Sequence, residues 1–424
     1  MLQEANYWLT TLEQPVYQTL PLPEKVDVAV IGGGFSGLSA GLRLAKAGCS
    51  VAVLETHNMG WGASSRNGGM VLTGMKLGVD TLIKSFGLQS AKRMFALSLA
   101  AIDTVERIVR EEKIDCAFSR CGHLEAAWKP AHFAGYSRAA ELFEKEFGHT
   151  VHVLTRSELH TEIGSDLYQG GFLDELSAGI NPAQFAAGLA VAASRAGAAL
   201  HEKTELLNVE RQSSGFLLHT NRGQLHADKV FVGTGGYAGA AIPAPQKRLI
   251  PIGSCIVVTA PLPEALACGI NPHKRMIFDS KHFLLYFRLT PDNRLLMGGR
   301  AAFLPETPTS VRESAPILQQ AILSIYPQLK DIPVEYVWGG GLDFAFDTMP
   351  HAGLLGDLYY ASRYAGHGVA FATHLGGLVA AQMLSEKVKN PLIGFSFPQM
   401  PLYNGVPWFL PLVGMYYKFL DIVS

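Results

Sequence analysis

Short apolar runs and a helical pattern alternate at the start of the chain. Residues 26–31 form an apolar, β-branched run, as expected for a strand buried on both faces. Residues 38–45 carry apolar side chains at a spacing of three to four, which predicts a helix. Residues 50–54 are apolar again. The order strand, helix, strand predicts a βαβ unit within a parallel sheet.

The middle of the chain changes its pattern. Residues 91–112 and 130–147 are mainly helical, whereas 255–259, 283–288 and 294–300 have the composition of strands. A Pro-Asp-Asn turn between the last two strands predicts a hairpin. No repeat or low-complexity linker divides the chain, so we expect its domains to interleave.

Two apolar stretches near the end of the chain resemble membrane segments. Residues 364–385 contain no Asp, Glu, Lys or Arg, but four glycines and two histidines favour a buried helix. Five prolines within residues 390–417 exclude a regular spanning helix. The apolar, aromatic tail at 401–424 has two interpretations: it packs on the protein, or it contacts a membrane surface. The N-terminus has no signal-peptide pattern, so we expect a cytoplasmic protein, membrane-associated on that face under the second interpretation.

Composition excludes several classes of protein. The 424 residues have a net charge of -1, with 48% hydrophobic and 17% charged residues, which excludes a disordered chain. The absence of a basic surplus argues against nucleic acid as a partner. Five scattered cysteines and the lack of paired histidines predict neither disulfides nor a metal site. The 44 glycines exceed the usual share, and their positions carry the functional signal.

The first glycine cluster follows the first strand directly. Gly32 permits a tight turn, Gly34 lets the backbone approach a pyrophosphate, and Gly37 lets the helix pack closely on the strand. Glu55 ends the second strand, where an acid accepts hydrogen bonds from a ribose diol. Together these features predict a dinucleotide site with its phosphates at the helix N-terminus.

A second cluster at residues 60–69 combines small residues, hydroxyls and one arginine. Because it comes directly after the ribose acid, it can wrap a ligand longer than NAD. Ser64 and Arg66 have the chemistry to reach phosphate oxygens, and the glycines let backbone approach a flat ring. This cluster favours FAD.

Residues 62–69 resemble the G-A-S-x-R-N-G-G element of the D-amino-acid-oxidase-like flavoprotein superfamily, and the chain is most similar to its gamma-glutamylputrescine oxidase and amine oxidase branch. Nearly the whole chain shares the resemblance. Further matching segments are Tyr7 and Trp8, the strand and glycine turn at 230–239, the W-x-G element at 338–341, the D-x-x-P element at 347–350 and the G-H-G element at 366–368.

The resemblance implies an α/β fold: a Rossmann-like FAD-binding domain of the glutathione-reductase type, with an inserted α+β substrate domain whose antiparallel sheet roofs the flavin. On this basis we expect an FAD-binding domain from 1–85, 150–245 and 335–400, a substrate domain from 86–149 and 246–334, and the tail at 401–424.

The resemblance also implies the residues that bind the cofactor. Those expected to contact FAD are Gly32, Gly34, Phe35, Ser36, Gly37, Glu55, Thr56, Gly62, Ala63, Ser64, Arg66, Asn67, Gly68, Gly69, Leu206, Thr234, Gly235, Gly366, His367, Gly368, Val369 and Ala370. Arg66 lies where one histidyl attachment occurs in relatives, and 344–346 lies in the region of a cysteinyl attachment. We therefore expect non-covalent FAD.

The implied reaction is oxidation of a C–N bond of an amine or amino acid, with hydride transfer to flavin N5, imine hydrolysis and reoxidation by O₂ to give H₂O₂. Gamma-glutamylputrescine-like amines or cyclic imino acids are the expected substrates. A membrane-associated dehydrogenase that passes electrons to a quinone is the alternative, motivated by the tail. An FAD module in RNA modification is a second alternative, which the neutral charge disfavours.

Four residues are candidates for positioning the substrate. Tyr286 and Arg288 are two apart on a predicted strand and so share a face, from which Arg288 could pair with a carboxylate or make a structural ion pair. His367 lies at the flavin edge or supports a turn, and Trp338 is a wall residue or ordinary core. Ala370 stands where sarcosine-oxidase-like relatives carry a carboxylate-binding lysine, which disfavours a small sarcosine-like amino acid.

Overall fold

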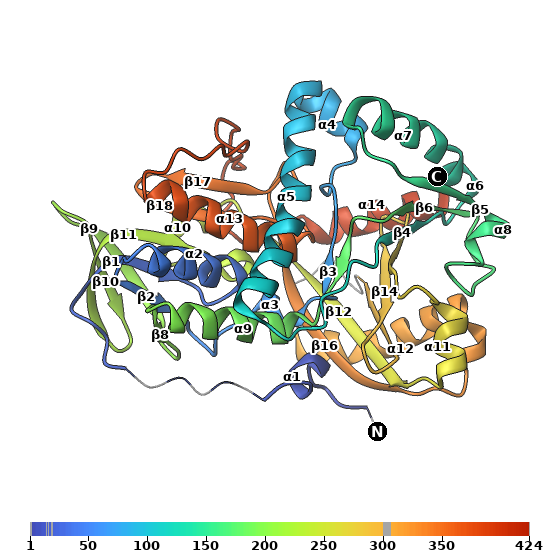
Figure 1. The fold of residues 1–424 in the computed structure, drawn as a ribbon, viewed down its shortest axis with the longest axis horizontal. Coiled ribbons are helices and arrows are strands. Elements are labelled where there is room, and N and C mark those ends of the chain that lie inside the picture. Colours follow the sequence, from blue (N-terminus) through green and yellow to red (C-terminus); the bar gives the residue numbers. More distant parts are fainter. Residues whose placement is uncertain (1, 14, 16, 18–19, 300–306, 424) are drawn as a thin grey trace.

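Two large sheets lie side by side in the computed structural model, which describes residues 2–13, 15, 17, 20–299 and 307–423 (Figure 1). Arg300, the last residue of one expected strand, lies outside the described residues, as does the end of the tail at Ser424. The two sheets match the predicted FAD-binding domain and roofing sheet, and the predicted α/β fold class is confirmed.

The first sheet, which we call the dinucleotide sheet, has the order β17-β18-β11-β1-β2-β8. Neighbours from β18 to β8 run parallel, while β17 and the β9–β10 hairpin pair antiparallel. Its strands are β1 (Lys25–Ile31), β2 (Val51–Leu54), β8 (Ala199–His201), β9 (Leu206–Arg211), β10 (Phe216–Thr220), β11 (Gly223–Val232), β17 (His351–Leu355) and β18 (Leu358–Ser362).

The second sheet, the roof sheet, has the order β16-β12-β15-β14-β13-β4-β6-β5. It is antiparallel as expected, except that β13 and β4 run parallel. Its strands are β4 (His123–Ala126), β5 (His152–Thr155), β6 (Gly170–Asp174), β12 (Ile250–Pro261), β13 (Met276–Asp279), β14 (Leu285–Leu289), β15 (Arg294–Gly299) and β16 (Val334–Phe344). A two-stranded ladder of β3 (Met70–Val71) and β7 (Ala178–Gly179) accompanies the two sheets.

Helices cover both sheets and fill the junction (Figure 1). They are α1 (Tyr7–Thr10), α2 (Phe35–Lys46), α3 (Ala63–Arg66), α4 (Val79–Phe86), α5 (Leu88–Glu112), α6 (Pro130–Ala134), α7 (Tyr136–Leu142), the π-helical turn η1 (Phe143–Phe147), α8 (Arg156–Leu159), α9 (Pro182–Arg195), the 3₁₀ turn η2 (Gly235–Tyr237), α10 (Pro243–Gln246), α11 (Glu264–Ile270), α12 (Pro308–Ile325), the 3₁₀ turn η3 (Pro327–Leu329), α13 (Gly368–Met383) and α14 (Leu410–Val423). The uncharged segment at 364–385 is therefore mostly the buried helix α13.

The packing suggests a different division into domains from the one expected at 150–245 and 86–149. Strands β5 and β6 pair with the roof sheet, and α5 packs against α13 and α9 in the core of the dinucleotide half. We therefore propose that α5 belongs to the FAD-binding domain and that β5 and β6 belong to the substrate domain. The tertiary pairing, which a single sequence does not show, decides both assignments.

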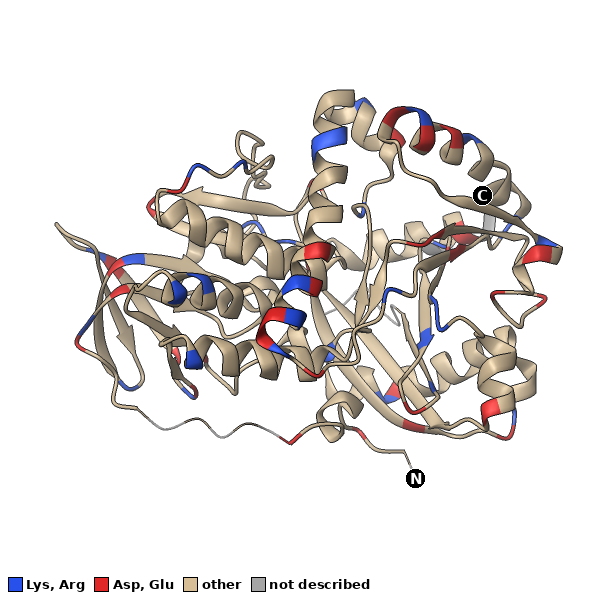
Figure 2. Cartoon of the chain, in the orientation of Figure 1, with Lys and Arg blue, Asp and Glu red and all other residues tan. Residues whose placement is uncertain are grey.

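The tail ends in α14, whose Asp421 carboxylate accepts hydrogen bonds from the backbone N–H groups of His282 and Phe283, at 2.8 and 2.9 Å. The outward face of the helix exposes apolar side chains at helical spacing: Leu412, Met415, Tyr416 and Phe419. Within the described residues, no helix is both long and apolar enough to cross a membrane. Figure 2 shows Lys and Arg interspersed with Asp and Glu along the ribbon of the described residues.

Candidate functional site

A cavity of about 1050 Å³ opens between the two sheets. Its lining runs from the ends of β1 and β2, past the N-termini of α2 and α13, to the inner face of the roof sheet. This volume is at the upper end of the range for small-ligand pockets, which is about 300–1,000 Å³. The cavity therefore has room for an extended ligand and a second, smaller one.

The N-terminus of α2 faces this cavity, and its N-cap residue, Gly34, has no side chain to cap the first backbone amides. Gly32 adopts φ +99°, and a Cβ there would lie 2.9 Å from the carbonyl oxygen of Gly233. A Cβ at Gly34 would lie 2.8 Å from Ser64 Oγ, which accepts a hydrogen bond from the Phe35 N–H at 2.9 Å. This cradle of backbone amides and one hydroxyl fits a pyrophosphate.

Glu55 lies at the end of β2 and lines the same region. Its two carboxylate oxygens each accept one backbone hydrogen bond, from the Gly33 N–H at 2.8 Å and the His57 N–H at 2.9 Å. A carboxylate oxygen has two lone pairs, so each retains an acceptor site. The arrangement fits a ribose diol, as the sequence predicted.

The loop at residues 60–69 is tied down by its own polar groups. Arg66 donates to the carbonyl oxygens of Trp61 and Gly339, at 2.9 and 3.2 Å, and its guanidinium lies 4.6 Å from the Trp61 ring centroid. Trp338 Nε1 donates to the Arg66 carbonyl oxygen, and Trp8 Nε1 donates to that of Asn67. These side chains fix the loop that forms part of the cavity wall.

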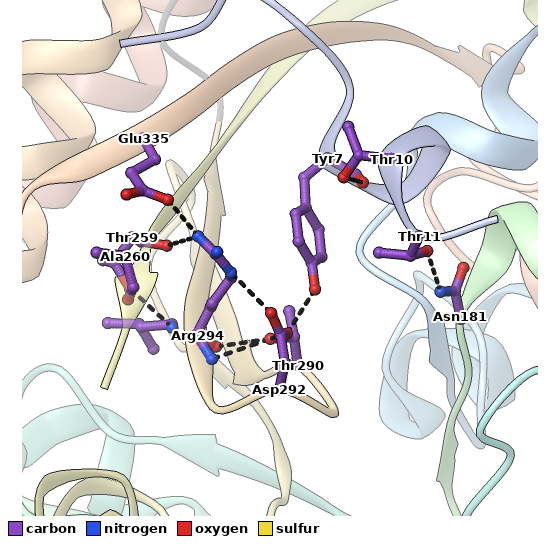
Figure 3. A network of polar contacts seen from close by, with 11 residues as sticks. Tyr7, Thr10, Thr11, Asn181, Thr259, Ala260, Thr290, Asp292, Arg294 and Glu335 are labelled. Atoms are coloured by element: carbon purple, nitrogen blue, oxygen red, sulfur yellow. Dashed lines mark hydrogen bonds and ion pairs between the residues drawn. The ribbon is translucent and has the colours of Figure 1, made fainter. Parts of the chain in front are cut away.

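The N-terminal segment also binds the hairpin between β14 and β15 of the roof sheet (Figure 3). Tyr7 donates to Asp292 at 2.5 Å, and Arg294 bridges Asp292 and Glu335 at 2.7 and 2.5 Å. On the other side of the same segment, Asn181 donates to the Thr11 hydroxyl at 2.8 Å. Residues 6–11 therefore contact both the loop at 60–69, which we call the cofactor loop, and the roof sheet, and hold the two together.

The N-terminus of α13 faces the cavity with His367 as its N-cap residue and no side-chain cap. The Nδ1 atom of His367 is buried and has no hydrogen-bond partner among the described residues. Burial, with smaller effects from Lys76 and His123, lowers the pKa of His367 to about 3. The imidazole is therefore neutral, and its unpaired nitrogen and the free amides of α13 suit a polar ring edge on a bound cofactor.

Helices α2 and α13 cross closely beside the cavity. A Cβ at Gly376 would lie 2.2 Å from the Ser36 carbonyl oxygen, and Ser39 Oγ donates to the Thr373 carbonyl oxygen at 2.6 Å. Ser36 Oγ also shares a 2.5 Å hydrogen bond with the Tyr364 hydroxyl. The crossing brings two helix N-termini to one cavity, as a ligand with phosphates at one end and an electron-accepting ring at the other requires.

The cavity gathers most of the residues that the sequence singled out. Predicted residues in its lining are Gly32, Gly34, Phe35, Ser36, Glu55, Thr56, Gly62, Ala63, Ser64, Arg66, Asn67, Gly68, Leu206, Thr234, Gly235, Tyr286, Gly366, His367, Gly368 and Val369. Five others do not line it: Gly37, Gly69, Ala370, Arg288 and Trp338.

Arg288 lies behind the cavity wall. It is 5% exposed, and its guanidinium donates to the carbonyl oxygens of Gly69 and Ile180 at 2.9 and 3.0 Å. Arg288 lies on the same face of β14 as Tyr286, as the spacing predicts, but its guanidinium supports the cofactor loop. We therefore do not propose that Arg288 binds a substrate carboxylate.

The roof sheet lines the cavity with a row of four side chains, of which the sequence singled out Tyr286 alone. Glu125 lies opposite Phe278 on β13 and Phe172 on β6, and Phe278 lies opposite Tyr286 on β14. All four residues line the cavity. Burial raises the pKa of Glu125, although the Tyr136 hydroxyl, which donates to its Oε1 at 3.1 Å, and Lys76 act in the opposite direction. A lone carboxyl in a short apolar strand is the one signal that could have marked this position.

A second buried acid borders the same wall. Asp279 forms an ion pair with Lys281 at 2.9 Å, and the Lys281 ammonium lies 4.3 Å from the Trp128 ring centroid. Burial raises the pKa of Asp279 to about 6, and Lys281 offsets part of this effect. Lys281 is therefore engaged by two partners at the cavity edge.

Comparison with known proteins supports the identity of the cofactor. The family model "FAD dependent oxidoreductase" (DAO) matches residues 27–382. Gamma-glutamylputrescine oxidoreductase of Escherichia coli (strain K12) is 31% identical over 410 residues, which cover 96% of this chain and 95% of that protein. A probable oxidoreductase, OrdL, of Rhizobium meliloti (strain 1021) is 32% identical over 392 residues, 91% of this chain and 90% of the relative.

Solved structures share the fold at lower sequence identity. Glycine oxidase from Geobacillus kaustophilus superposes with a TM-score of 0.72 at 24% identity, covering 89% of this chain and 100% of the other. L-proline dehydrogenase from P. horikoshii superposes with a TM-score of 0.68 at 22% identity, covering 94% and 99%. The extent of the family match, together with a cavity that fits a dinucleotide with a polar ring edge, shows that the chain belongs to the FAD-dependent oxidoreductases of the DAO family.

Proposed function

We propose that this chain oxidises a C–N bond of an amine or amino acid to an imine, which water then hydrolyses. FAD supplies the hydride acceptor for the carbon beside nitrogen. The observation that carries the proposal is the continuous cavity, which joins the N-termini of α2 and α13 to an aromatic roof face. The names of the relatives, an oxidoreductase of gamma-glutamylputrescine and a glycine oxidase, support this class of substrate.

The chain's own residues would orient the substrate and exclude water. Tyr286 places its ring over Gly298, where a Cβ would lie 2.1 Å from Tyr286 Cζ, and against Gly68, where it would lie 2.9 Å from Cε2. The ring thereby fills the gap between the roof sheet and the cofactor loop. The positive end of α13 would stabilise the negative charge that develops on the cofactor during the reaction.

The test is an anaerobic titration of the purified, FAD-loaded protein against a panel of amines and amino acids. A substrate should bleach the yellow absorbance, and readmitted air should restore it with formation of H₂O₂. Failure of every amine and amino acid to bleach the protein would contradict the proposal.

Acid precipitation of the same sample tests how the FAD is attached. It should leave the colour in the supernatant, whereas a yellow pellet would contradict non-covalent FAD.

A dehydrogenase that delivers electrons to a quinone is the second candidate. The exposed apolar face of α14, formed by Leu412, Met415, Tyr416 and Phe419, favours it because such a face suits a membrane surface. The rate of reoxidation decides between the two: rapid recovery in air supports the oxidase, and recovery only with an added quinone supports the dehydrogenase.

A further inference from the structure

Aromatic rings surround the Glu125 carboxyl on the roof side of the cavity. Phe278 and Phe172 flank it on the neighbouring strands, and the Tyr136 ring packs against Phe172 with a centroid distance of 5.3 Å. Phe143 closes the same wall, 5.9 Å from Phe172. A carboxylate among aromatic faces is the environment that attracts an alkylammonium ion, through charge and through cation–π contacts.

The hydrogen bonding of Glu125 leaves capacity for such a ligand. Among the described residues one hydrogen bond reaches the carboxyl, from the Tyr136 hydroxyl to Oε1. The charged groups that influence it are Lys76, which favours ionisation, and Asp279, which opposes it. Lys281, the other lysine in the lining, is paired with Asp279. A cation that enters here would meet an acceptor oxygen that no donor of the described residues fills.

The position of Glu125 separates it from the reacting bond. It lies two strands from Tyr286 in the roof sheet, and adjacent strands are about 4.8 Å apart, so the two backbone positions are ~10 Å apart. Tyr286 is the residue of this row that touches the cofactor loop, through Gly68. A nitrogen bound at Glu125 is therefore several bonds away from a carbon placed beside the flavin.

We propose that Glu125 binds an ammonium group of the substrate that is distinct from the nitrogen being oxidised, so that the enzyme prefers diamine-like substrates. The inference rests on the proposed function, because it assigns the second end of the same substrate. It explains why the wall is built from a carboxyl and aromatic rings, while the nearby arginine, Arg288, is turned to backbone carbonyls.

Binding to the FAD-loaded protein tests the assignment without relying on turnover. The probes are 1,4-diaminobutane and 1,6-diaminohexane, each compared with the monoamine of equal length, by anaerobic calorimetry and by the shift in flavin absorbance. The wild-type protein should bind at least one diamine about tenfold or more tightly than its monoamine, the strength expected of a charged hydrogen bond. Glu125→Gln should abolish this preference and leave monoamine binding unchanged. The control is Glu141→Gln, an exposed residue of α7 outside the cavity, which should retain the preference.

Several results would overturn the assignment. They are a wild-type protein without diamine preference, an E125Q variant that keeps it, and an E125Q variant that loses diamines and monoamines equally, which would place Glu125 on the reacting nitrogen. If E125Q does not fold, Glu125→Asp offers a milder test, because it keeps the charge but withdraws the carboxylate by one methylene group; a preference that is unchanged for diamines of both lengths would also contradict the proposal. Diamine binding to a protein that no amine or amino acid of the panel bleaches would instead reject the proposed function and leave the ammonium site standing.

Discussion

The two walls of the cavity are built on different principles. On the dinucleotide side the ligand-facing groups are mainly backbone amides, exposed by glycines at positions such as Gly32 and Gly34, with the Ser64 hydroxyl and the Glu55 carboxylate beside them. On the roof side they are side chains, Glu125 and the rings around it, brought together by strand pairing between residues far apart in sequence. A substitution of a side chain can therefore change the second wall directly, whereas it changes the first only where it moves the backbone.

The largest effect is expected from a lesion in the backbone-built wall. A Cβ at Gly37 would lie 1.9 Å from the Gly32 carbonyl oxygen, so Gly37→Ala must displace the turn that meets the cofactor. We expect a loss of about 3 kcal/mol or more in the free energy of unfolding and a protein without bound FAD. Absorbance at the flavin band of the purified protein and denaturant unfolding measure both.

Gly269→Ala is the matched control for this lesion. Gly269 lies within α11, has no neighbour within 4 Å of an added Cβ, and is remote from the cavity lining. Alanine there should stabilise the protein by about 0.5–1 kcal/mol. A Gly37→Ala protein that is yellow and as stable as this control would show that the cradle tolerates side chains, and the contrast between the walls would fail.

A lesion in the roof should spare the cofactor. Gly298→Ala places a Cβ 2.1 Å from Tyr286 Cζ and forces the ring from its position. Overpacking of this kind costs about 1–3 kcal/mol in the free energy of unfolding. The displaced ring should also lose about 1.4 kcal/mol of contact with the amine, so the KM should rise by about tenfold while the FAD content stays at the wild-type level.

The double variant Gly298→Ala, Tyr286→Ala sharpens this test, because it removes the colliding ring. The free energy of unfolding that it loses should be smaller than the sum of the losses in the two single variants, which would demonstrate coupling between the two positions. Strictly additive losses of stability would show that Tyr286 does not collide with the new side chain. A loss of FAD in Gly298→Ala alone would show that the roof cannot be changed independently of the cofactor wall.

The contrast also explains how much of the protein the sequence predicted. The βαβ unit, the cofactor, the fold class and the buried helix α13 follow from local patterns, since glycines and apolar periods act within a few residues of themselves. Glu125 and Phe172 were missed because their meeting depends on β4 pairing with β6, and no local pattern records that pairing. Arg288 faces the same side as Tyr286, as expected, but its length carries the guanidinium past the cavity to carbonyl oxygens.

A buried polar network around Asp174, at the end of β6 in the roof sheet, should make a pH-dependent contribution to stability. Burial disfavours the charge on Asp174, but a hydrogen bond from His149 at 2.7 Å, the nearby His123 and a bond from Thr73 at 2.6 Å outweigh it and lower its pKa to about 2. A lowered pKa stabilises the fold above the unfolded value of 3.8, and this stabilisation is lost as the pH falls through about 2.

Asp174→Asn should therefore cost about 2 kcal/mol in the free energy of unfolding at pH 7, and the difference from wild type should shrink below pH 4. Denaturant unfolding of both proteins across this range measures the effect. A difference that stays constant down to pH 2 would mean that packing, and not the charge of Asp174, accounts for the loss.

The smallest expected effect concerns the tail, which supports the roof wall from outside. Asp421 accepts the backbone N–H groups of His282 and Phe283, and the His282 ring stacks on Tyr417 at 5.2 Å. These residues follow Lys281 in the segment that borders the cavity.

Asp421→Ala should weaken the attachment of the tail by about 1 kcal/mol, because two hydrogen bonds to a partly exposed carboxylate are lost. Hydrogen exchange at the amides of 282 and 283 should accelerate about fivefold, with FAD content and diamine preference unchanged. Asp357→Ala, which removes an exposed pair with Arg211 at the opposite sheet, serves as the control and should leave those amides unaffected. Unchanged exchange in Asp421→Ala would show that the apolar contacts of α14, and not this carboxylate, hold the tail against the roof wall.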